Sequence, residues 1–185
     1  MFKFFRKNSE RDAAALALYS TAVEQARLPV FYESYGVADT PDGRFDMIMV
    51  HVFLILRRLK DGDKLHQDLA QAVFDMMFAD MDQNLREMGA GDIGVSHRIK
   101  DMAKAFYGRI AVYEAGLDDA EKGSLEAALR RNLYRKNDPH DAQVSAMSTH
   151  IRAQALALSD QALEEFVSGR MKFDAPSPEV GMSND

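Results

Sequence analysis

Histidines and carboxylates are the residues of this chain that could bind a metal or transfer a proton. A carboxylate-bridged di-metal site in a helical bundle needs glutamates followed three residues later by histidine on facing helices. No glutamate here has a histidine three residues later, and no two histidines lie four residues apart. We therefore predict no metal site. The histidines are His51, His66, His97, His140 and His150.

Other short motifs of enzymes and ion sites lack a required part. The Asp-x-Asp-x-Asn run at residues 80–84 opens like a calcium loop, but Leu85 stands where glycine is required and Gly91 where the bidentate acid belongs. The glycines of GAGDIG lack the Gly-Lys-Ser/Thr of a phosphate loop. There is no Gly-x-Ser-x-Gly elbow and no cysteine nucleophile. We predict a protein without catalytic residues or a cofactor, and therefore not an enzyme.

The composition is that of a globular protein. A chain of 185 residues can bury a substantial core in one domain. Hydrophobic residues make up 46% and charged residues 28%, which excludes a disordered chain. The net charge of −6 offers no basic face, so no nucleic-acid partner is predicted. No apolar run approaches the roughly 20 residues that span a bilayer.

Apolar residues recur at helical spacing throughout, and turns rich in Gly, Pro, Asp and Asn separate the periodic segments. The predicted fold class is all-α, an irregular single-domain bundle of about six to seven helices. Residues 1–8 are predicted to form a basic and aromatic segment, residues 9–170 the helical domain and residues 171–185 a disordered tail. The predicted helices span 9–27, a short piece after 30, 44–60, 64–88, 95–114, a helix from 118 or 119 that carries Leu133, 141–158 and 159–169.

Two of these helices indicate how the bundle is arranged. The helix 44–60 is apolar nearly all round between Met47 and Leu56, which is typical of a helix at the centre of a bundle. His51, within this run, is interpreted as a hydrogen-bonded core histidine. In the helix 64–88, Phe74 and Phe78 widen the apolar stripe toward a second contact.

Methionine usage favours a binding role. Flexible thioethers suit surfaces that accept varied apolar partners, and they also fill irregular cores, which is the favoured interpretation for any single residue. The central helices carry Met47, Met49, Met76, Met77, Met81, Met88 and Met102 of the chain's eleven methionines.

The first seven residues interleave aromatic and basic side chains. Such a segment suits an anionic lipid surface, where each basic residue adds about 1 kcal/mol. We predict membrane contact here, with a frayed terminus as the alternative. The residues are Phe2, Lys3, Phe4, Phe5, Arg6 and Lys7.

Three segments resemble the ubiquinol–cytochrome c chaperone family: FYESYGV (31–37), DTPDGRFDMIMVHVFLILRRL (39–59) and FADMDQNLREMGAGDIGVSHRIKDMAKAFYGR (78–109). The most specific pieces are GRFDM followed by a histidine and RRL, and LREMG-x-GD before a helix ending in FYGR. The resemblance implies a non-enzymatic assembly chaperone that binds newly made cytochrome b and promotes assembly of ubiquinol–cytochrome c reductase.

The resemblance also implies a location and further partners. Mitochondrial relatives work with a small helical partner and touch the ribosome exit, so both are expected contacts. The start MFKFFRK resembles the bacterial form, which implies a cytoplasmic protein peripheral at the inner membrane. Two alternatives remain open: a scaffold that binds another soluble or membrane partner, and an enzyme that binds a quinone or isoprenoid.

Client binding is predicted on the segment 85–109, which concentrates charges that a core does not favour. Arginine and tyrosine are frequent anchors of interfaces, and Lys100, Lys104 and Tyr107 recur at helical spacing. The alternative is that these charges only cap helices and pair with one another. The predicted client-binding residues are Arg86, Glu87, Asp92, Lys100, Lys104, Tyr107 and Arg109.

Overall fold

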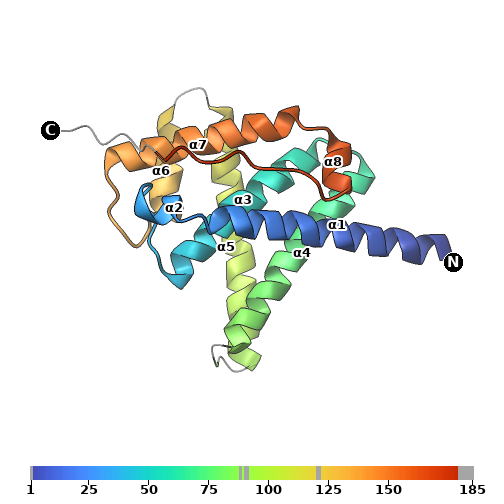
Figure 1. The fold of residues 1–185 in the computed structure, drawn as a ribbon. Helices are drawn as coiled ribbons and strands as arrows, with labels where there is room; N and C mark the ends of the chain where they lie inside the picture. Colours follow the sequence, from blue (N-terminus) through green and yellow to red (C-terminus); the bar gives the residue numbers. More distant parts are fainter. Residues whose placement is uncertain (1, 88, 90–91, 120–121, 179–185) are drawn as a thin grey trace.

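The computed structural model describes residues 2–87, 89, 92–119 and 122–178. Over these residues the chain forms eight helices and no strand (Figure 1). The predicted all-α class, an irregular single-domain bundle, is confirmed. The helices are α1 (Phe2–Ala26), α2 (Val30–Glu33), α3 (Pro41–Lys60), α4 (Lys64–Glu87), α5 (Asp92–Asp118), α6 (Lys122–Asn132), α7 (Asp141–Asp160) and α8 (Leu163–Val167).

Helix α3 lies at the centre of the molecule and packs against α1, α4, α5 and α7. Every residue from Asp46 to Ile55 is buried, as the pattern of the sequence predicts. The Nδ1–H of His51, whose residue is 1% exposed, donates to the carbonyl of Met47 at 2.9 Å. The interpretation of His51 as a hydrogen-bonded core residue is therefore confirmed.

The methionines of α3 and α4 mostly fill the core. Met47, Met49, Met77 and Met81 are all buried, so they are not surface ligands for a partner. Met88 lies outside the described residues.

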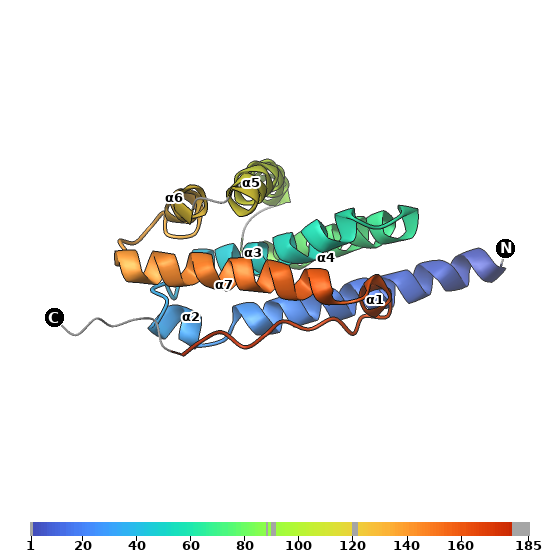
Figure 2. The same cartoon turned by 90° about the horizontal axis from the view of Figure 1, so that it is seen from above.

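The helices form a body with one projecting hairpin. Helices α4 and α5 pack against each other, and their connected ends extend away from the body (Figure 1). Seen from above, α5 and α6 lie on one side of α3, and α1 lies on the other (Figure 2). In this hairpin, the connected ends of α4 and α5 therefore pack on each other and lie beyond the rest of the bundle.

Several helix boundaries differ from the predicted ones. Helix α3 begins three residues early, at Pro41, because Thr40 accepts a hydrogen bond from the Gly43 N–H at 3.1 Å and proline suits the first turn. Helix α5 continues through Gly116 to Asp118. A Cβ at Gly116 would lie 2.8 Å from Leu125 Cα, so this glycine permits a close crossing with α6.

Helices α6 and α8 are shorter than predicted. Helix α6 ends at Asn132, so Leu133, predicted within it, follows the helix and is still buried at 2% exposure. Ser159 donates to the Leu156 carbonyl at 2.6 Å within α7 and caps no new helix. Helix α8 therefore begins only at Leu163.

The predicted domain ends also differ. Helix α1 begins at Phe2 because no glycine or proline interrupts the segment before Ser9, so residues 2–8 continue the helical domain. Residues 171–178, which we call the strap, run extended along α1 and α7 (Figure 2). The prediction of a disordered tail is wrong for the strap, since Met171 is only 2% exposed and Phe173 packs on the core. Residues 179–185 lie outside the described residues.

Candidate functional site

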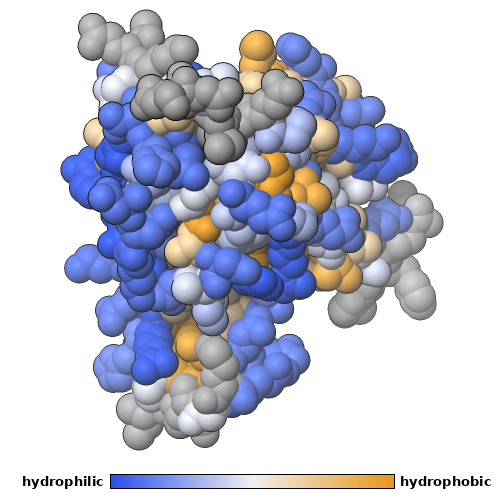
Figure 3. Space-filling model, turned by 60° about the vertical axis from the view of Figure 1, so that its left-hand side comes forward, coloured by the Kyte–Doolittle hydropathy of each residue, from blue (hydrophilic) through white to orange (hydrophobic). Residues whose placement is uncertain are grey.

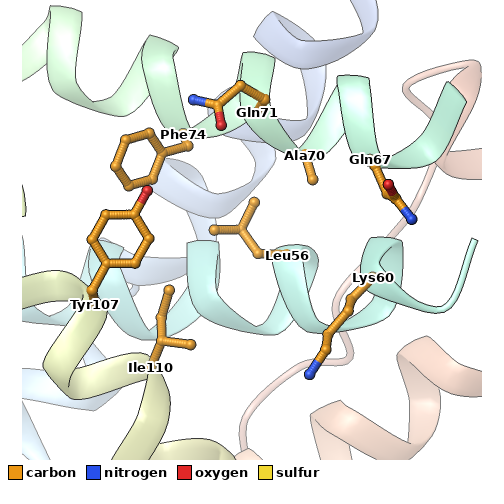
Figure 4. Close-up of a pocket in the computed structure, with 8 residues that line it drawn as sticks. All are labelled: Leu56, Lys60, Gln67, Ala70, Gln71, Phe74, Tyr107 and Ile110. Carbon is orange, nitrogen blue, oxygen red and sulfur yellow. The ribbon is translucent and has the colours of Figure 1, made fainter. Parts of the chain in front are cut away.

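An apolar groove lies where α3, α4 and α5 meet (Figure 4). Its volume is about 240 Å³, and it is open to the surface. Each helix contributes residues about one turn apart, which places them on one face of that helix. The groove is lined by Leu56 and Lys60 of α3, Gln67, Ala70, Gln71 and Phe74 of α4, and Tyr107 and Ile110 of α5.

Aromatic rings form the end of the groove nearer the hairpin. The Phe74 ring lies 5.4 Å from the Tyr107 ring, centroid to centroid, and 5.7 Å from the buried Phe106 ring. The Phe78 ring lies 4.7 Å from the Phe74 ring, centroid to centroid. Tyr107 is 58% exposed, the largest aromatic exposure among the described side chains of the core helices. The groove therefore has a fixed aromatic base and one ring that partly faces solvent.

Polar side chains also border the groove: Lys60 and Gln67 lie at the opposite end, and Gln71 lies beside Phe74 (Figure 4). Lys60 Nζ donates to Glu114 Oε1 at 2.7 Å, and this bond raises the pKa of Lys60. Gln71 Nε2 donates to Asp75 Oδ1 at 2.8 Å. Because these groups already have partners, the groove offers a partner mainly apolar surface with a polar margin.

A buried ion pair holds α5 against α3, two of the three helices that form the groove. Arg109 Nη1 donates to Asp46 Oδ1 at 2.6 Å, and Arg135 Nε donates to Asp46 Oδ2 at 3.0 Å. Asp46 is 3% exposed. Burial raises the pKa of the Asp46 carboxyl, while Arg109 and Arg135 act in the opposite direction. The pair joins α3, α5 and the segment after α6.

The structure brings only some of the predicted client-binding residues together. Lys100, Lys104 and Tyr107 are exposed on α5, and Tyr107 lines the groove. Arg109 instead points toward α3, with a side chain 13% exposed in its pair with Asp46. Arg109 therefore has a structural partner and does not share a face with the other three.

The remaining predicted residues lie at the far end of the hairpin. Arg86 Nε is 2.5 Å from Asp82 Oδ2, and Glu87 accepts from Gln83 Nε2 at 2.9 Å, so both have partners one turn back on α4. Asp92 opens α5, and its side chain lies outside the described residues, as do those of residues 2–7. Apolar surface shows between polar residues over this hairpin and higher on the same face (Figure 3).

Two features are absent from the part of the chain that the structure describes. No group of three or more His, Asp or Glu side chains is arranged to hold a metal ion there. No helix among those residues is long and apolar enough to cross a membrane.

The family model for ubiquinol–cytochrome c chaperones matches residues 33–173, which include every residue of the groove. The chain belongs to the ubiquinol–cytochrome c chaperone family. This is a family of chaperones and not of enzymes.

Individual relatives agree with this family membership. The chaperone is 34% identical to a solved structure, the Cbp3 homolog from Brucella abortus, with a TM-score of 0.83 over 93% of this chain and 94% of that one. It is 26% identical over 141 residues to ubiquinol-cytochrome-c reductase complex assembly factor 1 of Xenopus laevis, and 25% identical to the protein of that name in Homo sapiens. The match covers 70% of the frog protein and 47% of the human one, and 76% of this chain.

The sequence indicated part of the groove. The widening of the apolar stripe by Phe74 and Phe78 predicted a second contact for α4, and α5 provides it. The sequence pattern places Leu56 and Ile110 on the apolar lines of their own helices and gives no signal for Gln67, because a shared face depends on how three helices cross.

Proposed function

We propose that this chaperone promotes assembly of the ubiquinol–cytochrome c reductase complex by binding newly made cytochrome b. The observation that carries the proposal is the family match, which spans α3, α4 and α5 and the groove between them. The relatives named as assembly factors of that complex support the same role.

The groove provides a physical basis for binding an apolar client. Cytochrome b is a membrane protein of many helices, so its unassembled segments present apolar side chains to water. A cavity of about 150 Å³ can hold a benzene ring, and the groove measures about 240 Å³. One large side chain of the client can therefore enter between Leu56, Phe74 and Tyr107. Lys100 and Lys104, on the exposed face of α5, would meet polar loops that flank the client helix.

The proposal extends to the location of the protein. The basic and aromatic residues 2–7 support contact with an anionic membrane, since spacings of three and four put Lys3, Arg6 and Lys7 close together on a helix. The proposed position is cytoplasmic and peripheral at the inner membrane. A small helical partner and the ribosome are further contacts that the family resemblance supports.

The client assignment is tested by deleting the gene. We expect assembled cytochrome b to fall while its transcript stays at the normal level, because the protein would act after synthesis. The measurement is the haem spectrum of cytochrome b in isolated membranes, together with transcript quantification. Complementation with the intact gene is the control. If cytochrome b accumulates normally with both haems in the deletion strain, the proposed function is wrong.

A further inference from the structure

The strap, residues 171–178, is bound in the manner of an extended peptide ligand. Met171 is 2% exposed and Phe173 packs partly buried with its ring 5.0 Å from the His51 ring, while Lys172 and Asp174 are exposed. This two-residue alternation is typical of an extended chain with one face buried. The strap thus places two apolar side chains inward and leaves the positions between them in solvent.

Two glutamines, Gln154 of α7 and Gln161 directly after it, bind the backbone of the strap. Gln161 donates from Nε2 to the Lys172 carbonyl at 2.8 Å and accepts from the Lys172 N–H at 2.9 Å. Gln154 makes the same pair of bonds with the backbone of Asp174, both at 3.0 Å. Gln154 lies within α7 and Gln161 is the residue that ends it, seven positions further along the chain. Their amides replace the neighbouring strand that an extended chain would have in a sheet.

Helix α1 contributes the opposite wall. Gln25 Nε2 donates to the same Asp174 carbonyl at 2.9 Å. Because these bonds go to peptide groups, they do not depend on which side chains the bound segment carries. The sequence of the bound segment is constrained only at its two inward positions, which require large apolar side chains.

Exchange of the strap for another extended backbone preserves the hydrogen bonds of Gln154. Gln154 is 1% exposed while the strap is bound, and both of its bonds to Asp174 are made to the strap backbone. Simple opening exposes the side chains of Met171 and Phe173 to water. An incoming extended segment instead offers the same N–H and carbonyl groups and covers the same apolar surface.

Space for a second chain exists beside the strap. A cavity of about 620 Å³ lies between α1 and the strap, bordered by Thr21, Glu24 and Leu28 on one side and by residues 169–173 on the other. Gly169, with a φ of 68° that glycine adopts without strain, precedes the strap and allows the chain to turn there. An incoming segment can thus lie alongside the strap before replacing it.

We propose that the groove between α1 and α7 is a binding site for an extended segment of a partner protein, with large apolar side chains at two alternate positions, and that the strap occupies this site in the free protein. The partner's backbone takes over the bonds to Gln154 and Gln161. Its two apolar side chains take the places of Met171 and Phe173. This site is separate from the groove of α3, α4 and α5 and does not depend on the identity of the client.

The probe for this site is a fluorescent peptide with the sequence of residues 170–178. In the full-length protein the attached strap competes at high effective concentration, so we expect weak binding by the wild type. The double variant Met171→Ala with Phe173→Ala removes the strap's own anchors and should bind the peptide at least tenfold more tightly. Adding Gln161→Ala should reverse this gain. Binding is measured by fluorescence anisotropy.

The matched control is the same peptide with serine at both inward positions, which should not bind. The proposal is overturned if the folded double variant binds no better than the wild type, or binds the serine peptide equally well. The wild type could instead form a dimer at higher concentration in which the strap amides are protected from exchange. That result would show that a second copy of this chain occupies the site, and it would overturn the assignment to a partner protein.

A second measurement avoids any loss of folding in the variants. Hydrogen exchange of the Lys172 and Asp174 amides is followed in the unaltered protein with and without excess unlabelled peptide. We expect the peptide to speed exchange of these two amides while the amides of α3 keep their rates. If the hydrogen-exchange rates of the Lys172 and Asp174 amides are unchanged at the highest soluble peptide concentration, the proposal is overturned.

Discussion

Arg109 and Asp46 form a buried pair across the interface of α5 and α3, with 2.6 Å between Nη1 and Oδ1. Removing one member of such a pair leaves the other charge buried without its counterion, which typically costs 3–5 kcal/mol, so we expect Asp46→Ala to lower the free energy of unfolding by about 3 kcal/mol. The measurement is urea denaturation followed by circular dichroism.

The exposed pair of Asp39 and Arg44 provides the control, since both side chains are more than half exposed. Surface pairs contribute about 0–1 kcal/mol, so Asp39→Ala should change stability by less than about 1 kcal/mol. Equal losses in the two variants would show that burial of Asp46 does not determine its contribution.

Two buried histidines should make stability depend on pH. Burial lowers the pKa of His51 to about 3 and that of His150 to about 4, from an ordinary value of 6.5. As the pH falls, the two histidines take up protons in the unfolded chain before they do so in the folded one. Their contribution to the free energy of unfolding is therefore fully present above pH 6.5 and is lost as the pH falls from 6.5 toward 4. Each histidine contributes a slope of up to about 1.4 kcal/mol per pH unit in this window.

The variant His150→Leu isolates one of these contributions. His150 Nε2 is buried, and no hydrogen-bond partner for it is found among the described residues, so we expect no loss of stability at pH 7.5. Between pH 6 and pH 5 the slope should be smaller than that of the wild type by about 1.4 kcal/mol per unit. Urea denaturation across this range measures both slopes, and identical slopes would contradict the assignment.

The close crossing of α5 and α6 predicts opposite effects for two glycines of the same helix. At Gly116 a Cβ would meet the backbone of Leu125 at 2.8 Å, so Gly116→Ala should destabilise the protein by about 1–3 kcal/mol. At Gly108 no atom lies within 4 Å of the added Cβ, so Gly108→Ala should stabilise α5 by up to about 1 kcal/mol. Thermal melts compare the two, and a stabilising Gly116→Ala would rule out the tight crossing.

Client binding at the groove predicts the effect of a paired substitution. Lys100→Glu with Tyr107→Ala reverses a rim charge and removes the exposed ring, so we expect recovery of cytochrome b from solubilised membranes to fall at least tenfold. The control, Arg131→Glu with Leu156→Ala, makes the same kinds of change at exposed sites on α6 and α7. Unchanged recovery by a folded groove variant would place the client elsewhere, with the rest of α4 as the next surface to test.

Membrane contact predicts a charge-dependent loss of vesicle binding. Changing Lys3, Arg6 and Lys7 to glutamine should weaken flotation with anionic vesicles. Added salt should weaken binding of the wild type, because the Debye length is only about 10 Å at 0.1 M salt. Neutral vesicles and the variant Lys64→Gln with Arg131→Gln are the controls. Equal flotation of the triple variant and the wild type would remove residues 2–7 from the proposal.

Local pattern accounts for what the sequence predicted well. The position of α3 at the centre followed from its apolar run, and the role of His51 followed from its place within that run. The sequence also indicates on which face of α5 Arg109 lies. It is nine residues from Lys100, a spacing of two and a half helical turns, so the two side chains lie on opposite faces. Residue type alone, without this spacing, is what predicts a client contact at Arg109.

The strap could not be predicted in the same way. Met171 and Phe173 are two apolar residues in a polar segment, and the glutamines that bind their neighbours lie on another element. Isolated side chains of this kind give no periodic signal long enough to indicate extended structure. Contacts between distant parts of the chain determine this region.

The bond between Gln25 and the Asp174 carbonyl joins residues that are 149 positions apart. During synthesis α1 is made before α3 and α4, which pack on it, and the strap follows only much later. Contacts of such long sequence separation form late because the intervening chain must first be ordered. Until residues 171–178 have left the ribosome, the side of α1 that the strap covers therefore stays exposed to water. The nascent chaperone then has an uncovered apolar surface of its own, which is the condition of its proposed client.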